Sequence, residues 1–540
     1  MTTCADALLC LLAQMGVDTV FGIPGNHTIE LYRGLERWGI RHVTSRHEQG
    51  AAFMADGYAR ASGKPGVCFL VSGPGLLNAA TAIAQARADS VPMLIITGVA
   101  NKADLGMQRG TLHELPDQRA SATTFSRFSH TLLDPANLSR VIQRAFTCFT
   151  CARPGPVHIE IPLDVMSQST PEPKAFPVPA PPGPAPGAIE DAGARLARAD
   201  KPLILLGGGA IGAAEHLPAL AERLDAPILN TVNGKGIVPA NHPLSVGGSP
   251  ALPTLQQALA DSDAVLAIGT EIAETDYDLL MAGATELRES LIRLDIDAEQ
   301  IGNNATPGLG ITSDAGPGVQ ALLTALRNDL FDKQSDKQGT QRAATLRESV
   351  RRETHFNPEM QVFLDALSAA APTAVLLGDS TRPTYYAAWQ YECDQPRSYF
   401  HSASGFGTLG WSLPAAFGAA LGTDRPVIGL IGDGGAQFTL PELGTGAQER
   451  LGVPIVVWNN AGFEEIENSM IGRGVATGST VLQPPDFAAT AAAHHCLFAH
   501  ATDAAGLTRA VRDALQAEIP TIIEVRQDDF LTQPSGQWYT

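Results

Sequence analysis

Several features are scarce in this 540-residue chain, and each scarcity excludes a class of protein. The seven cysteines are scattered and odd in number, so a disulfide framework is not expected. Cys148-x-x-Cys151 lacks a second Cys or His pair that would complete a zinc site. Basic residues are outnumbered, 37 against 56 acidic ones, and the resulting net charge of −19 argues against nucleic acid as a partner.

Long hydrophobic runs are also missing, so no membrane span is expected. The apolar start, residues 1–12, has neither a basic region before it nor a cleavage site after it. We therefore interpret it as a first helix and expect a cytoplasmic protein. The chain is 44% hydrophobic and 17% charged, which is typical of a globular protein, and its length predicts about three domains.

Apolar runs that end in glycine turns alternate with helical stretches along most of the chain, and the helices predicted near its start include residues 28–36, 51–61 and 78–88. This alternation predicts the α/β class, with doubly wound, mainly parallel sheets covered by helices on both faces. Eight prolines between residues 171 and 186 predict an extended linker. The predicted domains and connections are residues 1–165, the linker 166–188, a middle domain 189–330, a helical connector 331–356 and a third domain 357–540.

The middle domain contains a glycine pattern, Gly207-x-Gly209-x-x-Gly212, directly after an apolar run. As a string it matches the dinucleotide-binding fingerprint. The next predicted strand, however, ends in Asn230, with no acidic residue placed to bind a ribose. We therefore favour a tight strand–helix turn over a dinucleotide site.

Two polar motifs follow neighbouring predicted strands in the third domain. Gly432-Asp433-Gly434-Gly435 ends the strand 426–431, and Asn459-Asn460 ends the strand 452–458. Asp433 and Asn460 are 27 positions apart, about the length of one strand–helix–strand unit. A carboxylate and an amide oxygen suit Mg²⁺, and the glycines let backbone N–H groups approach a diphosphate. A Gly-Asp-Gly sequence alone is also a common turn; the second motif makes the pattern specific.

This pair of motifs resembles the diphosphate-binding signature of enzymes that use thiamine diphosphate (ThDP). The string RHEQGAAFMADGYARASGKPG resembles the segment that carries their catalytic glutamate, and the stretch from Ser72 to Asn78 is similar to the SGPGxxN of the acetolactate-synthase-like branch. The resemblance covers nearly the whole chain. It implies a ThDP pyrimidine-binding domain, a Rossmann-like middle domain and a ThDP diphosphate-binding domain.

The resemblance also implies roles for individual residues. It assigns Asp433, Asn460 and the carbonyl of Gly462 to Mg²⁺, and Glu48 to the ring nitrogen N1′ of the cofactor. A carboxyl in a dry pocket can share a proton with such a nitrogen. Further residues implied at the cofactor are Asn78, Ser380, Gly407, Leu409, Gly434 and Gly435. Leu409, expected beneath the bent cofactor, can equally be an ordinary core leucine.

Three acid-rich stretches, residues 110–118, 268–278 and 463–467, resemble the 5-guanidino-2-oxopentanoate (2-ketoarginine) decarboxylases. A guanidinium pairs well with carboxylates, so we expect Glu465 to bind the substrate, with Glu464 and Glu467 behind it. These acids can also simply face solvent. His113 is a candidate proton donor or a structural histidine. Asn26 occupies a position that faces the thiazolium in relatives, where we expected an apolar residue.

The predicted activity is non-oxidative decarboxylation of a 2-oxo acid, through a ThDP enamine, to an aldehyde and CO₂. The alternative is acetolactate-synthase-type carboligation; a third is a silent, cofactor-binding subunit, against which the presence of Glu48, Asp433 and Asn460 argues. Mg²⁺ is expected, and FAD is allowed but not expected. The family places its active sites between subunits, so a homodimer or homotetramer is predicted, acting on a small 2-oxo acid without nucleic acid or membrane.

Overall fold

The structure is a computed structural model that describes residues 2–171, 173–277, 287–326, 338–353 and 357–531. Its contacts divide the chain into two compact units. The first comprises residues 1–179, 369–382 and 401–540, and the second comprises 180–368 and 383–400. Each unit is described by itself.

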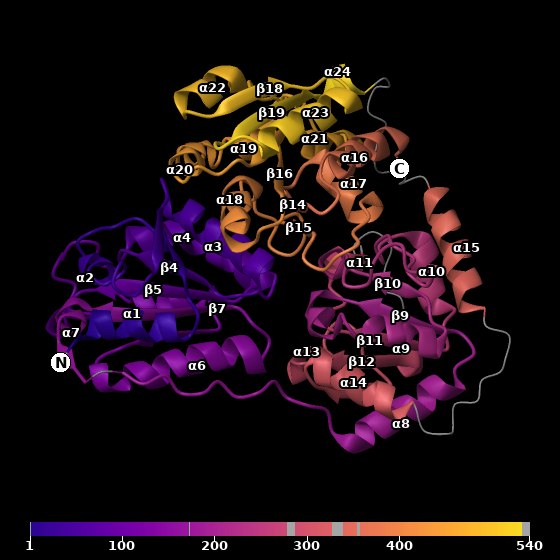
Figure 1. Cartoon of the computed structure of the whole chain (residues 1–540), viewed down its shortest axis with the longest axis horizontal. Coiled ribbons are helices and arrows are strands. Elements are labelled where there is room, and N and C mark those ends of the chain that lie inside the picture. Colours follow the sequence, from indigo (N-terminus) through magenta and orange to yellow (C-terminus); the bar gives the residue numbers. More distant parts are fainter. Residues whose placement is uncertain (1, 172, 278–286, 327–337, 354–356, 532–540) are drawn as a thin grey trace. The chain divides into compact units, whose positions relative to one another are not determined.

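The N-terminal part of the first unit is built on a six-stranded sheet. Its strand order is β3 (Arg41–Thr44), β2 (Thr19–Gly22), β4 (Gly66–Leu70), β5 (Met93–Val99), β7 (Pro156–Pro162) and β6 (Phe128–Thr131), and all neighbours are parallel. Helices α1 (Cys4–Gln14) and α6 (Leu138–Cys151) cover one face, and α3 (Glu48–Ser62) and α4 (Pro74–Ala88) cover the other (Figure 1).

Two helices that pack on this sheet begin earlier than predicted. As a result, the candidate site residues Glu48 and Asn78 both lie within helices. Helix α3 begins at Glu48 rather than Ala51, because the His47 side chain accepts from Gln49 N and caps it. Helix α4 begins at Pro74 rather than Asn78, with proline at the first helical position. Helix α2 is shorter than the predicted 28–36 and spans only Ile29–Tyr32.

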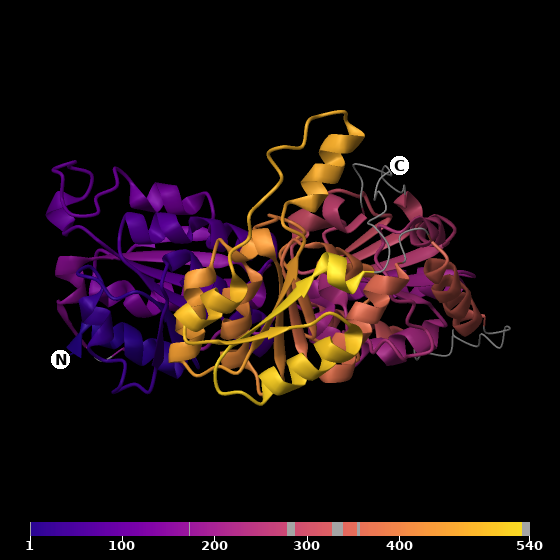
Figure 2. The same ribbon diagram turned by 90° about the horizontal axis from the view of Figure 1, so that it is seen from above.

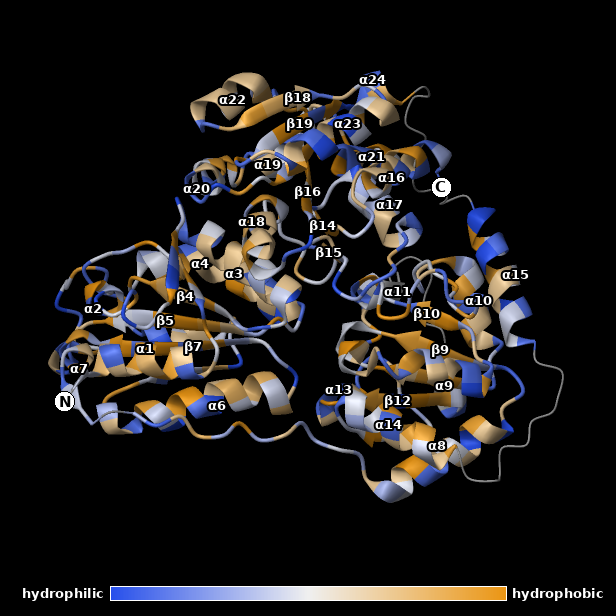
Figure 3. Ribbon diagram, viewed as in Figure 1, coloured by the Kyte–Doolittle hydropathy of each residue, from blue (hydrophilic) through white to orange (hydrophobic). Residues whose placement is uncertain are grey.

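The C-terminal part of the first unit carries a second six-stranded sheet. Its order is β15 (Tyr399–His401), β14 (Val375–Gly378), β16 (Val427–Gly432), β17 (Pro454–Asn459), β19 (Thr521–Arg526) and β18 (Leu497–His500). The strands from β14 to β18 are parallel. Helices α18 (Ser412–Gly422), α22 (Phe487–Ala493) and α23 (Ala504–Leu515) belong to this part, and their apolar stripes and the apolar strands stand out in Figure 3.

The two sheets of the first unit are joined by helix α3 packing on α18. A Cβ on Gly57 would lie 2.0 Å from Ala415 O, and one on Gly418 would lie 1.8 Å from Met54 O. Glycine at both positions therefore lets the helix backbones touch. Beside them Trp411 Nε1 donates to Asp56 Oδ1 at 3.0 Å, and Arg60 neutralises the buried Asp56.

The second unit is built on a five-stranded parallel sheet. Its order is β10 (Ile228–Asn230), β9 (Pro202–Leu206), β11 (Ala264–Ile268), β12 (Leu291–Asp295) and β13 (Leu309–Thr312). Helices α8 (Pro186–Arg198), α9 (Leu217–Leu224) and α14 (Ala315–Ala325) pack on one face. Helices α10 (Pro253–Ala260) and α15 (Gly339–Arg351) pack on the other.

The glycine pattern of the middle domain forms a tight turn after β9. A Cβ on Gly207 would lie 2.2 Å from Gly269 O, so the glycine is required by contact with the neighbouring turn. The following residues, Gly208–Ala213, form a 3₁₀ helix, and the α-helix begins only at Leu217. Close packing of two turns accounts for this glycine.

The fold contains further helices and short strands. They are β1 (Thr2–Thr3), α5 (Gln118–Thr123), α7 (Leu163–Met166), β8 (Ser169–Thr170), α11 (Glu274–Tyr277), α13 (Ala298–Ile301), α16 (Pro358–Ala370), α17 (Arg382–Gln390), α19 (Asp433–Ala436), α20 (Leu443–Gln448), α21 (Glu464–Gly472) and α24 (Gln527–Phe530). The predicted connector contains α15, while its residues 331–337 and 354–356 lie outside the described residues, as does Asp278 of the second acid-rich stretch.

The predicted fold class is confirmed, since the chain has three α/β domains with parallel sheets. The domain boundaries stay predictions. All seven cysteines lie among the described residues, and none of them is in a disulfide bond. Over the described ranges, no helix has the length and apolar character needed to cross a membrane.

Candidate active site

Glu48 and Asn78 come together at the carboxyl edge of the first sheet. Glu48 is the first residue of α3, and its Oε2 accepts a 2.9 Å hydrogen bond from Asn78 Nδ2 on α4. Gly75 lies beside them, since a Cβ there would be 3.5 Å from Glu48 Oε1. Asn78 and the neighbouring Leu77 are exposed. The predicted catalytic carboxyl is thus oriented by a neighbouring helix while its surroundings stay open.

A pair of histidines lies at the same edge. The rings of His27 and His113 meet edge to face, with centroids 5.1 Å apart. His27 Nδ1 is hydrogen-bonded to Ser72 Oγ, and burial, followed by the nearby His113, lowers the pKa of His27. His113 Nδ1 is buried and has no hydrogen-bond partner among the described residues. Asn26, the residue before His27, is exposed.

The His113 backbone is held against the glycine turn that follows β4. His113 has a φ of 60°, and a Cβ on Gly73 would lie 2.4 Å from His113 O. The buried side chain of Gln118 holds this turn in place. Its Oε1 accepts from Gly73 N at 2.8 Å, and its Nε2 donates to Glu160 Oε2 at 3.0 Å. Burial raises the pKa of Glu160. His27 and Gln118 are positioning residues that we had not singled out from the sequence.

Asp433 and Asn460 meet at the carboxyl edge of the second sheet, as their spacing predicted. Gly432 of β16 pairs with Trp458 of β17, and Asn460 N donates to Asp433 Oδ1 at 3.4 Å. Asp433 is 1% exposed, and its Oδ2 has no hydrogen-bond partner among the described residues. Burial raises the pKa of Asp433 to about 6. A buried carboxylate oxygen without a partner is one that a cation would stabilise.

The turn after β16 is shaped around two glycines. A Cβ on Gly434 would lie 2.7 Å from the Phe463 ring, and one on Gly435 would lie 3.5 Å from Asp379 Oδ2. Asp379 is fully buried, and its Oδ1 accepts from Ser380 N at 2.8 Å. Its Oδ2 has no hydrogen-bond partner among the described residues, and burial raises the pKa of Asp379 to about 6. Asp379 directly precedes Ser380, the residue of this strand end that the sequence predicts at the cofactor.

Glu464 supports the metal side of the site. Its Oε2 accepts from Asn460 Nδ2 at 3.0 Å, and its Oε1 accepts from Gln527 Nε2 at 3.0 Å and from Arg382 Nη1 at 3.3 Å. The side chains of Arg382 and Glu464 are only 6% and 14% exposed. Both carboxylate oxygens of Glu464 are thus already bound within the protein. Its predicted role at the substrate stays a prediction.

Glu465 and Glu467 lie in the first turn of α21. Burial, and then the charge of Glu464, raises the pKa of Glu465, while Arg382 acts in the opposite direction. Ile466 between them is 56% exposed. Figure 2 shows the orange segment around this helix and the loop after it projecting from the sheet. The partly buried Glu465 carboxyl, with its raised pKa, is therefore suited to receive a cation.

The loop with Gly407 and Leu409 is anchored by one contact to the first sheet's helices. Gln85 Oε1 accepts from Thr408 N at 3.1 Å and from Thr408 Oγ1 at 2.9 Å. Gly407 has a φ of +71° and is exposed, and Leu409 is partly exposed. Leu409 is therefore not a fully buried core leucine. Gly462, itself a predicted metal ligand, forms a bridge with Val481.

These residues fit ThDP with a divalent cation. Asp433 supplies a buried oxygen without a hydrogen-bond partner among the described residues, Asn460 is held beside it, and a side chain at Gly434 would clash with Phe463, so the turn requires glycine there. The edge with Glu48 offers a carboxyl at an open surface. Each of the two sheets therefore contributes one half of the predicted site.

Comparison with known proteins agrees with this arrangement. Models of the thiamine pyrophosphate enzymes match residues 2–121 (N-terminal TPP binding domain), 189–322 (central domain) and 379–525 (C-terminal TPP binding domain). Thiamine pyrophosphate is the same compound as ThDP.

Full-length relatives were also found. The "Probable 2-ketoarginine decarboxylase AruI" of Pseudomonas aeruginosa is 43% identical over 97% of this chain and 94% of its own. The acetolactate synthase large subunit of Parasynechococcus marenigrum is 32% identical over 96% and 87%. The acetolactate synthase isozyme 1 large subunit of Escherichia coli is 31% identical over 85% and 82%. Together with the three matching domains, these similarities show that the chain belongs to the thiamine pyrophosphate enzyme family.

Proposed function

We propose that this protein decarboxylates a 2-oxo acid that carries a guanidinium group, releasing CO₂ and an aldehyde. The relative that is 43% identical over nearly the whole chain is named for 2-ketoarginine. The observation that carries the proposal is Glu465, a half-buried carboxyl with a raised pKa beside the predicted metal residues. A guanidinium binding there would favour the charged carboxylate and pair with it.

Bound ThDP supplies the electron sink that accepts the electron pair left by departing CO₂. The protein's residues provide the rest. Asp433, Asn460 and the carbonyl of Gly462 hold the metal, while Gly434, Gly435 and Ser380 hold the diphosphate. Gly407 and Leu409 hold the cofactor's ring system, with Asn78. Glu48 keeps a proton at the cofactor's ring nitrogen, and its hydrogen bond to Asn78 orients the carboxyl for that transfer.

His113 is the group we assign to proton return before the aldehyde leaves. Its buried Nδ1 without a partner and its contact with His27 support this role. His27, hydrogen-bonded to Ser72, holds the His113 ring in place. Asn26 is exposed next to His27 and would border the substrate. Glu467 follows Glu465 by two residues in the first turn of α21 and adds negative charge to this helix N-terminus.

We further propose that the enzyme is at least a homodimer whose subunits complete each other's sites. Large apolar side chains are exposed near both halves of the site. They are Ile29, Leu77, Leu112, Phe406, Phe438 and Ile466. Apolar groups gathered around a site in this way are typical of surfaces that a partner subunit covers. We also propose the domain boundaries that the sequence predicts, with domains at residues 1–165, 189–330 and 357–540.

The test is CO₂ release, with ThDP and Mg²⁺, from 5-guanidino-2-oxopentanoate, pyruvate, benzoylformate and a branched-chain 2-oxo acid. We expect preference for the guanidino acid, lost selectively in Glu465→Gln by roughly 100-fold in kcat/KM. Glu518→Gln is the matched control, because Glu518 is an exposed carboxylate of the same unit that pairs with Arg450. A hydroxyketone formed from pyruvate would instead favour the carboligase, in keeping with the acetolactate synthases among the relatives.

A further inference from the structure

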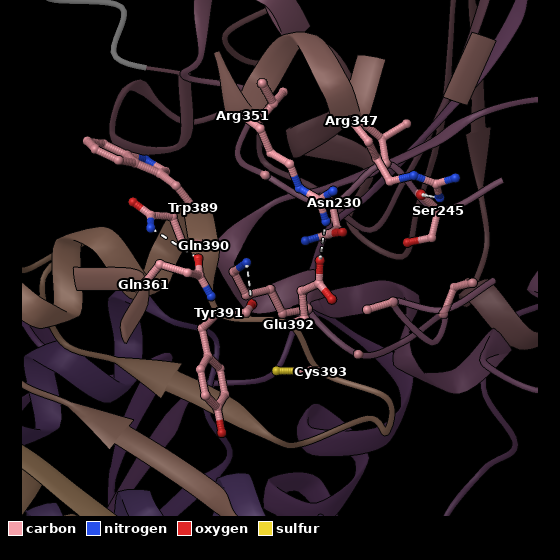
Figure 4. Close-up of a pocket in the computed structure, with 18 of the residues that line it drawn as sticks. Asn230, Ser245, Arg347, Arg351, Gln361, Trp389, Gln390, Tyr391, Glu392 and Cys393 are labelled. Carbon is pink, nitrogen blue, oxygen red and sulfur yellow. Dashed lines mark hydrogen bonds and ion pairs between the residues drawn. The ribbon is translucent and has the colours of Figure 1, made fainter. Parts of the chain in front are cut away.

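The second unit contains a cavity that the proposed reaction does not use. Its volume is about 370 Å³. It is lined by the loop after β10, by helices α15 and α16, and by residues 389–393, as Figure 4 shows. Gly207 and Gly209 of the tight turn are not among its lining residues. The cavity therefore lies apart from the glycine turn at which a dinucleotide would bind.

A buried lysine forms part of the cavity wall. Lys235 is 6% exposed, and its Nζ donates to Tyr391 O at 3.1 Å. An ammonium group has three donors, and this carbonyl is the acceptor that Nζ finds within the described ranges. Burying such a charge is unfavourable, and burial lowers the pKa of Lys235, while the charge of Glu392 acts in the opposite direction. An anion bound in the cavity would stabilise the positively charged form of Lys235.

The rest of the lining is also suited to an anion. Arg347 and Arg351 are four residues apart on α15, so both reach the same side of the cavity. Arg347 Nη1 is anchored by Ser245 O at 2.5 Å. The acidic residues of the lining are Asp365, which is exposed, and Glu392, whose Oε1 lies 3.8 Å from Arg351 Nη2. The lining thus holds three cationic side chains and two carboxylates, one of which, Glu392, is paired with Arg351.

We propose that this cavity binds a small organic anion, with its carboxylate or phosphate group at Lys235 and its apolar part against Trp389. The arginines add charge at the entrance, and the indole offers a flat apolar wall. The volume is near the lower end of small-molecule pockets, about 300 to 1,000 Å³, which excludes a molecule the size of FAD.

The experiment is isothermal titration of the full-length protein, saturated with ThDP and Mg²⁺ so that the diphosphate site is filled. The probes are inorganic phosphate, phenyl phosphate and benzoate, which separate phosphate from carboxylate recognition. We expect one saturable site per chain for phenyl phosphate or benzoate, and binding weakened about tenfold or more by Lys235→Met and by Arg351→Gln. Arg352→Gln is the matched control, because Arg352 is the next residue, 74% exposed, and does not line the cavity.

Arg351→Gln decides the test if Lys235→Met fails to fold, since the Arg351 side chain is 60% exposed and its replacement leaves the core intact. The proposal is overturned if no probe saturates below about 10 mM, or if Arg351→Gln and Arg352→Gln bind equally well. Residues of the first unit do not line the cavity, so the outcome is independent of the proposed decarboxylation.

Discussion

Asn78 Nδ2 lies 2.9 Å from Glu48 Oε2, and this hydrogen bond joins the first turn of α3 to the second turn of α4 at the same sheet edge. The amide can only donate through its nitrogen, so it favours the oxygen of Glu48 as an acceptor and leaves the other oxygen for a ligand. The proposed catalytic carboxyl is thus oriented by a residue fixed in its own helix.

Glu48→Gln should reduce kcat by roughly 100- to 10,000-fold, because an amide cannot exchange a proton with the cofactor ring. Asn78→Ala should reduce kcat by about tenfold, since the carboxyl remains but is no longer oriented. The measurement is steady-state CO₂ release together with ThDP affinity, which should stay within about threefold in both variants. Equal kcat for Glu48→Gln and native protein would refute the assignment.

Asp379 should make the stability of the cofactor-free protein depend on pH. Burial raises its pKa from 3.8 to about 6, so between these values the folded protein holds a proton that the unfolded chain has lost. Stability therefore falls as pH rises through this window, by on the order of 3 kcal/mol in total. Asp379→Asn should remove this contribution and leave the one from Asp433, whose pKa burial also raises to about 6. Urea unfolding at pH 4 and pH 8 measures it, with the exposed Asp424→Asn as the control that keeps it.

Glu464→Ala should weaken Mg²⁺ binding by about 10- to 100-fold, because Asn460 Nδ2 loses its acceptor and Arg382 is left buried without its carboxylate. The readout is the Mg²⁺ concentration that gives half-maximal activity at saturating ThDP. The double variant Arg382→Leu with Glu464→Ala should regain protein stability but not Mg²⁺ affinity. Recovery of both would show that Glu464 acts only through Arg382.

Gly434→Ala should abolish cofactor binding, because its Cβ would lie 2.7 Å from the Phe463 ring and 3.1 Å from Leu482. The added methyl group forces the ring or the turn to move, at a cost of about 1–3 kcal/mol. Phe463→Leu in the same chain should restore part of the ThDP affinity, measured by fluorescence quenching. If Phe463→Leu restores no affinity, the added methyl group clashes with the bound ThDP and not with the Phe463 ring.

Much of this protein was predictable from local patterns. Apolar runs bounded by glycine located the strands that carry the site, such as β16 and β17, because such runs must be buried in a parallel sheet. The distance between Asp433 and Asn460 predicted their meeting, since one crossover connection sets adjacent parallel strands side by side. The same motifs identified the family, which the comparisons confirm.

Tertiary structure alone decided the contacts between distant segments. Arg382 and Glu464 are 82 residues apart, and Gln85 and Thr408 are 323 apart, so no local pattern links them. The His27–His113 contact depends on the turn at Gly73, and the cavity at Lys235 depends on how residues 389–393 fold back. Local sequence determines which residues end a strand; the sheet order and helix packing determine which of those residues meet, because they bring together groups that the chain itself keeps far apart.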